Sequence, residues 1–171
     1  TFIDDLIGKI LGAVEQNGLS ENTQIFYLSD HGDNIGERDL WGKSNFYEES
    51  VGIPCIIKGP GIPVEKTVKT PVSLIDVCPT ILKTAGITLE GKPGTSLVDL
   101  ANAEDNLDRL VFSEYHAVGS ATGAFMIRKG RWKLVYYVSM QPQLFNLDDD
   151  PEELHDLGAD PKHEGKRRQL E

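Results

Sequence analysis

The sequence is poor in cysteine, in basic residues and in long apolar runs, and each shortage excludes a class of protein. Two cysteines in 171 residues do not suggest a disulfide framework, although a single bridge is left open. No apolar run approaches about 18 residues, so the sequence predicts no membrane span. The 17 Lys and Arg residues against 27 Asp and Glu residues give a net charge of −10, which argues against nucleic acid as a partner.

What the sequence does contain fits one folded domain, with or without a small subdomain. With 171 residues and 39% hydrophobic content, the chain is long enough to bury a substantial core. Apolar residues recur at helical spacing near the start, and Gly18 follows as a stop signal. These residues are Ile3, Leu6, Ile7, Ile10, Leu11 and Val14. They predict an amphipathic helix that leads into residues 24–28, an interior strand of an α/β sheet.

A long polar stretch separates this strand from the next one. Residues 29–50 contain three glycines among many polar side chains and predict a long loop. Within it, we expect Trp41 to pack the loop and not to touch a substrate. Residues 54–58 then predict a second buried strand, which ends at a Gly-Pro-Gly turn.

The following region predicts one helix and one connection. Ser73 with Asp76 three residues later predicts a capping box, which begins a helix over about 73–84. Pro79 within it predicts a bend or an irregular first turn. Residues 91–106 predict a polar connection.

The last third of the chain has the composition of antiparallel strands. Four segments rich in β-branched and aromatic residues predict these strands. They are residues 109–115, 124–129, 132–137 and 143–147. Short turns between them favour an antiparallel sheet in a small α+β subdomain. Residues 162–171 are polar and predict a frayed tail.

Three side chains suited to a site follow the strand over 24–28. Asp30 and His31 come directly after it, and Lys43 lies further along the loop. Ligands of open α/β sheets bind beyond the carboxyl ends of the strands. Asp and His both bind divalent cations, and a lysine is a point charge suited to a tetrahedral oxyanion. The structural alternatives are a turn for Asp30, a loop role for His31 and simple solvation for Lys43.

An ordered series of motifs runs along the chain. The first motif, Ser29 to Lys43, includes Asp-His-Gly and Leu-Trp-Gly-Lys. The others are Tyr47-Glu48-Glu49-Ser50 with Ile53-Pro54, Gly59-Pro60-Gly61, Ser73 to Leu82 with Ala85-Gly86, Leu144-Phe145-Asn146-Leu147, and Asp150 to Leu154. In this order, the motifs resemble the second half of the formylglycine-dependent sulfatases, in the alkaline phosphatase superfamily. The segments Phe112 to His116, Ala124 to Arg128 and Trp132-Lys133 are most similar to choline-sulfatase-like and arylsulfatase members. The resemblance covers nearly the whole chain.

This resemblance implies a fold and roles for the site residues. Residues 1–106 would be the carboxy-terminal part of an α/β catalytic domain, a mixed sheet flanked by helices, and residues 107–171 the small antiparallel subdomain. Asp30 and His31 would bind a divalent cation, expected to be Ca²⁺ with Mn²⁺ or Mg²⁺ as alternatives. Lys43 and His31 would act on the sulfate group. Further along, Glu114 and His116 at a strand end could face a cationic alcohol, or could simply be exposed there.

The nucleophile of the family is missing from the sequence. In the family, a Cys or Ser in a Cys/Ser-x-Pro-x-Arg motif of the amino-terminal half becomes formylglycine. Cys55 precedes two isoleucines, and Cys78 precedes Pro79 directly, with no arginine to follow. Asp4 and Asp5, in the predicted first helix, are poor substitutes for the family's acidic metal-binding pair. We therefore expect a carboxy-terminal piece that needs its amino-terminal half and is inactive alone.

The expected function is metal-dependent hydrolysis of a small-molecule sulfate monoester. A phosphonate monoester hydrolase or phosphodiesterase of the same superfamily is the close alternative, because sulfuryl and phosphoryl sites share these parts. A non-catalytic binding or scaffolding piece is the alternative from another class. The sequence leaves open which ester is cleaved, whether the protein is a homo-oligomer, and whether it is cytoplasmic, periplasmic or secreted.

Overall fold

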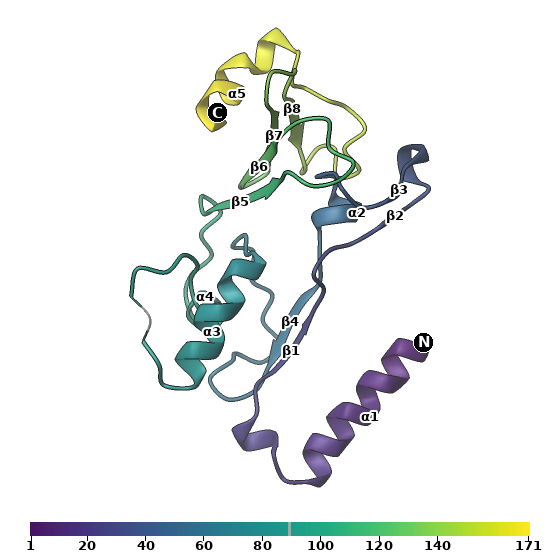
Figure 1. Cartoon of the computed structure of the whole chain (residues 1–171). Helices are drawn as coiled ribbons and strands as arrows, with labels where there is room; N and C mark the ends of the chain where they lie inside the picture. Colours follow the sequence, from purple (N-terminus) through teal and green to yellow (C-terminus); the bar gives the residue numbers. More distant parts are fainter. Residues whose placement is uncertain (89) are drawn as a thin grey trace.

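A computed structural model describes residues 1–88 and 90–171. Helix α1 (Phe2–Gln16) lies at one end of the molecule, and a four-stranded sheet with helix α5 (Glu164–Leu170) lies at the other (Figure 1). The hydroxyl of Thr1 accepts a hydrogen bond from the Asp4 amide, so α1 begins with a side-chain cap. The predicted amphipathic helix is confirmed. None of its residues is buried, and Phe2 and Ile10 are 76% and 63% exposed.

A 3₁₀ turn (Ser20–Asn22) connects α1 to the first pair of strands. Strand β1 (Ile25–Leu28) pairs antiparallel with β4 (Cys55–Lys58), from Ile25 opposite Lys58 to Leu28 opposite Cys55. Both predicted strands are confirmed, but the burial expected for them is wrong. Ile56 is 62% exposed and Cys55 is exposed as well, because neither strand has a second neighbour among the described strands.

The segment between β1 and β4 is more regular than the predicted loop. Strands β2 (Asn34–Ile35) and β3 (Trp41–Gly42) form a hairpin around a 3₁₀ turn (Glu37–Asp39), and helix α2 (Glu48–Val51) follows. The fully buried side chain of Asn34 donates to the carbonyl of Gly42 at 2.7 Å, which closes the hairpin. Trp41 is 77% exposed, so the expectation that it packs the loop is wrong.

The predicted capping box is present at Ser73 and Asp76. It begins a 3₁₀ turn (Leu74–Asp76) that continues into α3 (Val77–Thr84), so the helix has the irregular first turn that Pro79 predicted. The polar connection contains helix α4 (Leu97–Asn102), which the sequence did not predict. The Leu97 amide donates to the Thr80 hydroxyl at 2.7 Å, a contact between α4 and α3.

The carboxy-terminal sheet has four antiparallel strands in the order of the chain, as predicted. They are β5 (Leu110–Tyr115), β6 (Ala124–Lys129), β7 (Trp132–Tyr137) and β8 (Gln143–Asn146). One face buries Ala124, Met126 and Val135 against Phe46, and the other buries Leu134 and Leu144 against Leu170. The frayed tail is wrong: a 3₁₀ turn (Pro161–His163) leads into α5, whose Leu170 is 7% exposed.

Across the described residues, no helix combines the length and apolar character that crossing a membrane requires.

Candidate active site

Asp30, His31 and Lys43 come together at the carboxyl end of β1. His31 Nε2 lies 3.4 Å from the Asp30 carboxylate, and the Lys43 ammonium contacts the same nitrogen from the far side of the hairpin. The β2–β3 pairing explains this approach, because it returns the chain to β1 just before Lys43. The residues that the sequence singled out therefore form one cluster.

His31 is held in a defined orientation and tautomer. Its Nδ1 lies 2.7 Å from the carbonyl oxygen of Gly32. Because a carbonyl only accepts, Nδ1 carries the hydrogen and Nε2 presents a lone pair. Nε2 therefore accepts a hydrogen bond from the Lys43 ammonium, and it is the atom through which His31 can bind a cation.

The Asp30 carboxylate is exposed, and its surroundings favour the ionised form. The His31 amide donates to Asp30 Oδ1 at 3.0 Å, and this hydrogen bond lowers the pKa of the carboxyl below its ordinary value. The positive charge of Lys43 acts in the same direction. The Asp30 carboxyl is thus anionic over the neutral pH range.

A cavity of about 400 Å³ opens beside this cluster. Asp30, His31 and Lys43 line it together with Glu114, while Phe46 and Met126 form part of its apolar wall. The cavity lies between the segment after β1 and the edge strand β5. One charged end and one apolar wall suit a ligand with an anionic head and an organic remainder.

The structure brings Glu114 to this cavity but leaves His116 outside the lining. His116 Nε2 lies 3.6 Å from the Glu114 carboxylate, and its ring packs edge-on against Phe125 at 5.0 Å. Glu114 pairs with Phe125 across the sheet, whereas its neighbour Ser113 pairs with buried Met126. Because side chains alternate along a strand, Glu114 and Phe125 lie on the face opposite the Phe46 cluster. Glu114 thus borders the cavity from the edge strand β5, while its side chain lies on the other face of the sheet.

The metal ligands that the described residues supply are few. Within residues 1–88 and 90–171, no group of three or more His, Cys, Asp and Glu side chains is arranged to hold a metal ion. Asp30 and His31 are a hard oxygen and an imidazole nitrogen within 3.4 Å, which fits two positions of a divalent cation site. Two ligands leave a cation incompletely coordinated, so further donors would have to come from elsewhere.

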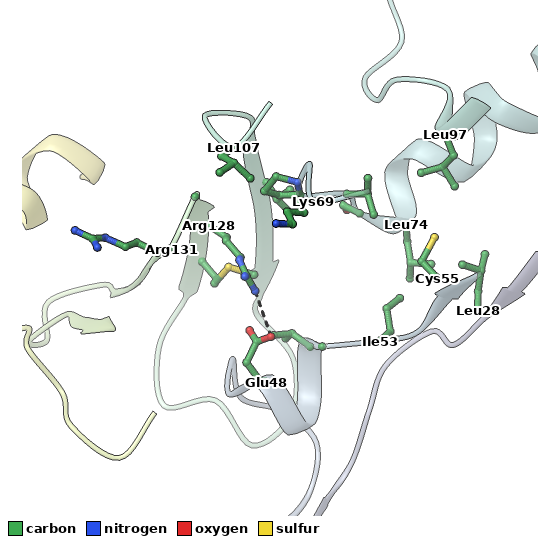
Figure 2. A pocket seen from close by; sticks show the side chains of 18 of the residues that line it. Leu28, Glu48, Ile53, Cys55, Lys69, Leu74, Leu97, Leu107, Arg128 and Arg131 are labelled. Carbon is green, nitrogen blue, oxygen red and sulfur yellow. Dashed lines mark hydrogen bonds and ion pairs between the residues drawn. The ribbon is translucent and has the colours of Figure 1, made fainter. Parts of the chain in front are cut away.

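A second cavity, of about 570 Å³, lies between the β1–β4 strand pair and the four-stranded sheet (Figure 2). Leu28, Ile53 and Leu74 line one side, and Glu48 and Arg128 reach into it from α2 and β6. Their ion pair spans 3.3 Å.

Sequence reasoning missed the charged groups around α2. Glu48 also pairs with Lys133, which in turn pairs with Glu153, and both Lys133 and Glu153 have fully buried side chains. The available signal was register: Lys133 stands two residues before Val135 on β7, so it shares the inward face with a core residue.

The family model described as Sulfatase matches residues 1–87, which include the whole cluster at the end of β1. Choline-sulfatase from Rhizobium meliloti (strain 1021) is 39% identical over 166 residues, 95% of this chain and 32% of that protein. The chain belongs to the sulfatase family. It spans about a third of the length of this sulfatase relative.

Solved structures show the same fold across almost the whole chain. BT4656, solved in complex with its substrate D-glucosamine-2-N,6-O-disulfate, has a TM-score of 0.88 and is 26% identical, over 98% of this chain and 36% of that chain. The phosphonate monoester hydrolase SpPMH from Silicibacter pomeroyi has a TM-score of 0.85 and is also 26% identical. The match covers 98% of this chain and 37% of that chain. The sulfatase fold predicted from the sequence is confirmed.

Proposed function

We propose that this chain is the carboxy-terminal part of an enzyme that hydrolyses a sulfate monoester, and that it supplies part of the metal and sulfate site. The convergence of Asp30, His31 and Lys43 at one end of a cavity carries the proposal. The family match, which includes all three residues, supports it. The nucleophile, a formylglycine in the family, belongs to a part of the protein outside this chain.

A divalent cation, with Ca²⁺ as the first candidate and Mn²⁺ or Mg²⁺ as alternatives, fits Asp30 and His31 as two of its ligands. The bound cation would supply positive charge that neutralises the sulfate oxygens. The Asp30 carboxylate provides a hard oxygen, which such cations prefer. His31 is oriented for binding through Nε2, because its Nδ1–H is engaged by the Gly32 carbonyl.

Lys43 acts on the sulfate group in this proposal. Its ammonium lies at the cavity beside His31 and is exposed, so it can exchange its contact with Nε2 for a sulfate oxygen. A fixed positive charge at that place stabilises the negative charge that develops during cleavage. His31 would then be free to bind the cation.

The remainder of the ester would lie along the apolar wall of the cavity toward Glu114. Glu114 borders this wall from the edge strand, so its negative charge would favour a cationic alcohol such as a quaternary ammonium, and His116 Nε2 lies 3.6 Å from the same carboxylate. This part of the proposal concerns substrate choice and not the sulfate chemistry.

A phosphonate monoester or phosphodiester is the second candidate substrate. The likeness to a phosphonate monoester hydrolase supports it, since that protein matches almost as well in fold as the sulfatases do. Both ester classes present a tetrahedral anion to Asp30, His31 and Lys43.

The test uses the intact protein that contains this chain. An aryl sulfate and an aryl phosphonate monoester are offered at equal concentration with Ca²⁺, and kcat/KM decides between the two candidates. In parallel, calorimetric titration compares Ca²⁺ binding to the parent and to Asp30→Ala, which should bind at least about tenfold more weakly, because a first anionic ligand is gone. Unchanged affinity and stoichiometry in a folded Asp30→Ala would remove Asp30 from the metal site.

A further inference from the structure

The segment that carries Lys43 lies directly on the carboxy-terminal sheet. Phe46, 5% exposed, packs against Ala124, Met126 and Val135. The hydroxyl of Tyr115, on β5, donates to the Ser44 hydroxyl at 2.9 Å. The proposed site is therefore built from one region of the chain and held by another.

A buried charge cluster joins α2 to this sheet. Lys133 Nζ lies 2.8 Å from Glu48 Oε1 and 2.7 Å from Glu153 Oε1, and the lysine side chain is completely buried. The other oxygen of Glu153 accepts a hydrogen bond from the Glu48 backbone amide at 2.7 Å. Lys133 and Glu153 thus hold both the side chain and the backbone at the first residue of α2.

A second set of contacts joins the same two parts of the chain. Arg38 Nη1 lies 2.8 Å from Glu49 Oε2, its guanidinium lies 4.2 Å from the centre of the Tyr47 ring, and Nη2 donates to the carbonyl of Glu152. The turn before Glu153 therefore also holds the hairpin.

Removal from water raises the pKa of Glu153, and the nearby charge of Lys133 opposes this effect. An isolated carboxylate would be unfavourable there, so the cluster depends on all its members.

The far end of α2 contacts the site itself. The Gly32 amide donates to the carbonyl of Ser50 at 2.8 Å. A Cβ atom at Gly32 would lie only 2.1 Å from the carbonyl oxygen of Glu49, so the two backbones are in close contact. Any shift of α2 is transmitted directly to the residue that follows His31 and accepts its Nδ1–H.

We propose that Lys133 and Glu153 are positioning residues: by holding α2 through Glu48, they fix Gly32 and so set the places of Asp30 and His31. This inference rests on the proposed function of Asp30 and His31, and it assigns part of the site's geometry to the antiparallel sheet. Misplacement of reacting groups by about 1 Å can reduce turnover by about a hundredfold.

The test replaces the buried charges by apolar side chains of similar length. In the intact protein, Lys133→Met/Glu153→Met removes both charges together, so that no unpaired charge remains buried. Amide hydrogen exchange at Gly32 should accelerate at least about tenfold, and kcat with an aryl sulfate should fall by about ten- to a hundredfold, at temperatures where the variant is fully folded. Glu48→Gln, a milder change at a side chain 32% exposed, should move both quantities in the same direction.

Leu134→Ala is the matched control. Leu134 is the next residue on β7 and packs on the opposite face with Leu144 and Leu170, so the change destabilises the same sheet without touching α2. The inference is overturned if the double variant and Glu48→Gln have the same exchange rate at Gly32 and the same kcat as Leu134→Ala. Lys133 and Glu153 would then have only a structural role. Hydrogen exchange needs no turnover. A parent without activity on sulfate esters would therefore refute the proposed function, while exchange at Gly32 would still decide whether the cluster holds the segment.

Discussion

The β1–β4 strand pair and the β5–β8 sheet differ in how they bury their side chains. Of the ten buried hydrophobic residues in the described part of the chain, six lie in β6, β7 and β8. Neither β1 nor β4 contributes one, and α1 has no buried residue. Yet the proposed site lies at the end of β1, where Asp30 and His31 meet Lys43.

This difference teaches that the buried core and the proposed site lie in different regions of the chain. Phe46 covers one face of the four-stranded sheet, and Leu170 of α5 covers the other. The sheet therefore has a core of its own. The strand pair leaves Ile56 and the α1 residues Phe2 and Ile10 in contact with water. Such exposed apolar surface is the kind that other parts of a protein cover.

The largest effect expected from this division is complete loss of activity in the isolated chain. The 171-residue chain should show no turnover of an aryl sulfate with Ca²⁺, because neither Cys55 nor Cys78 lies in a formylglycine motif. The measurement is a colorimetric assay against a blank without protein. Turnover above the blank that a substitution in this chain abolishes would contradict the prediction.

Stability should respond in the sheet and not in the strand pair. In the isolated chain, Leu144→Ala should lower the free energy of unfolding by about 2–5 kcal/mol, since it leaves a cavity at a residue with no exposed surface. Ile56→Ala should change it by no more than about 0.5 kcal/mol, as surface substitutions do. Urea denaturation measures both. Equal losses in the two variants would mean that the strand pair is as much a core as the sheet.

Lys43 should show the opposite pattern. In the intact protein, Lys43→Ala should lower kcat by about a hundredfold or more, because a fixed charge beside the sulfate is lost. Its melting temperature should change little, since Lys43 is exposed. Lys43→Arg should also be impaired, because a planar fork does not replace a compact ammonium. Steady-state kinetics and a melting curve test this prediction. A near-normal kcat in Lys43→Ala would refute the action of Lys43 on the sulfate group. A large fall in melting temperature would show that the role of Lys43 is structural.

The smallest effect concerns acid stability in the carboxy-terminal region. The Lys162 amide donates to Asp160 at 2.9 Å, and this hydrogen bond lowers the pKa of the Asp160 carboxyl. A lowered folded-state pKa contributes stability above the unfolded pKa of about 3.9, and this contribution is lost as pH falls through the lower value. Asp160→Asn should flatten the dependence of the melting temperature on pH below about 4. Unchanged slope would show that the hydrogen bond does not distinguish the folded state.

Local signals allowed much of this fold to be predicted. Strands β5, β6 and β7 have strong β-propensity, and Gly130, at φ +56°, makes the tight turn that separates two of them. The capping box at Ser73 needs only four consecutive residues. The cluster of Asp30, His31 and Lys43 was predicted from motif order, and the hairpin that brings Lys43 back was not.

The features that sequence reasoning missed depend on distant partners. Helix α4 has six residues and starts where the Leu97 amide meets Thr80, 17 positions earlier. The tail packs on the sheet through Leu170, and Arg167 donates to the carbonyl of Gly158 at 2.7 Å. Register places Lys133 on the inward face of β7, but its partner Glu48 lies 85 positions away. No local pattern contains such information.

The wide spacing of these partners also sets when the site can be completed during protein synthesis. Glu153 follows Glu48 by 105 positions, so the ribosome adds it about 5 to 20 s later at ordinary elongation rates. Until then, the first amide of α2 lacks its partner, and the segment that carries Lys43 lacks this part of its support, while the β1–β4 strand pair is already made. Translation that stops before Glu153 would therefore release a chain with every proposed site residue and no ordered site.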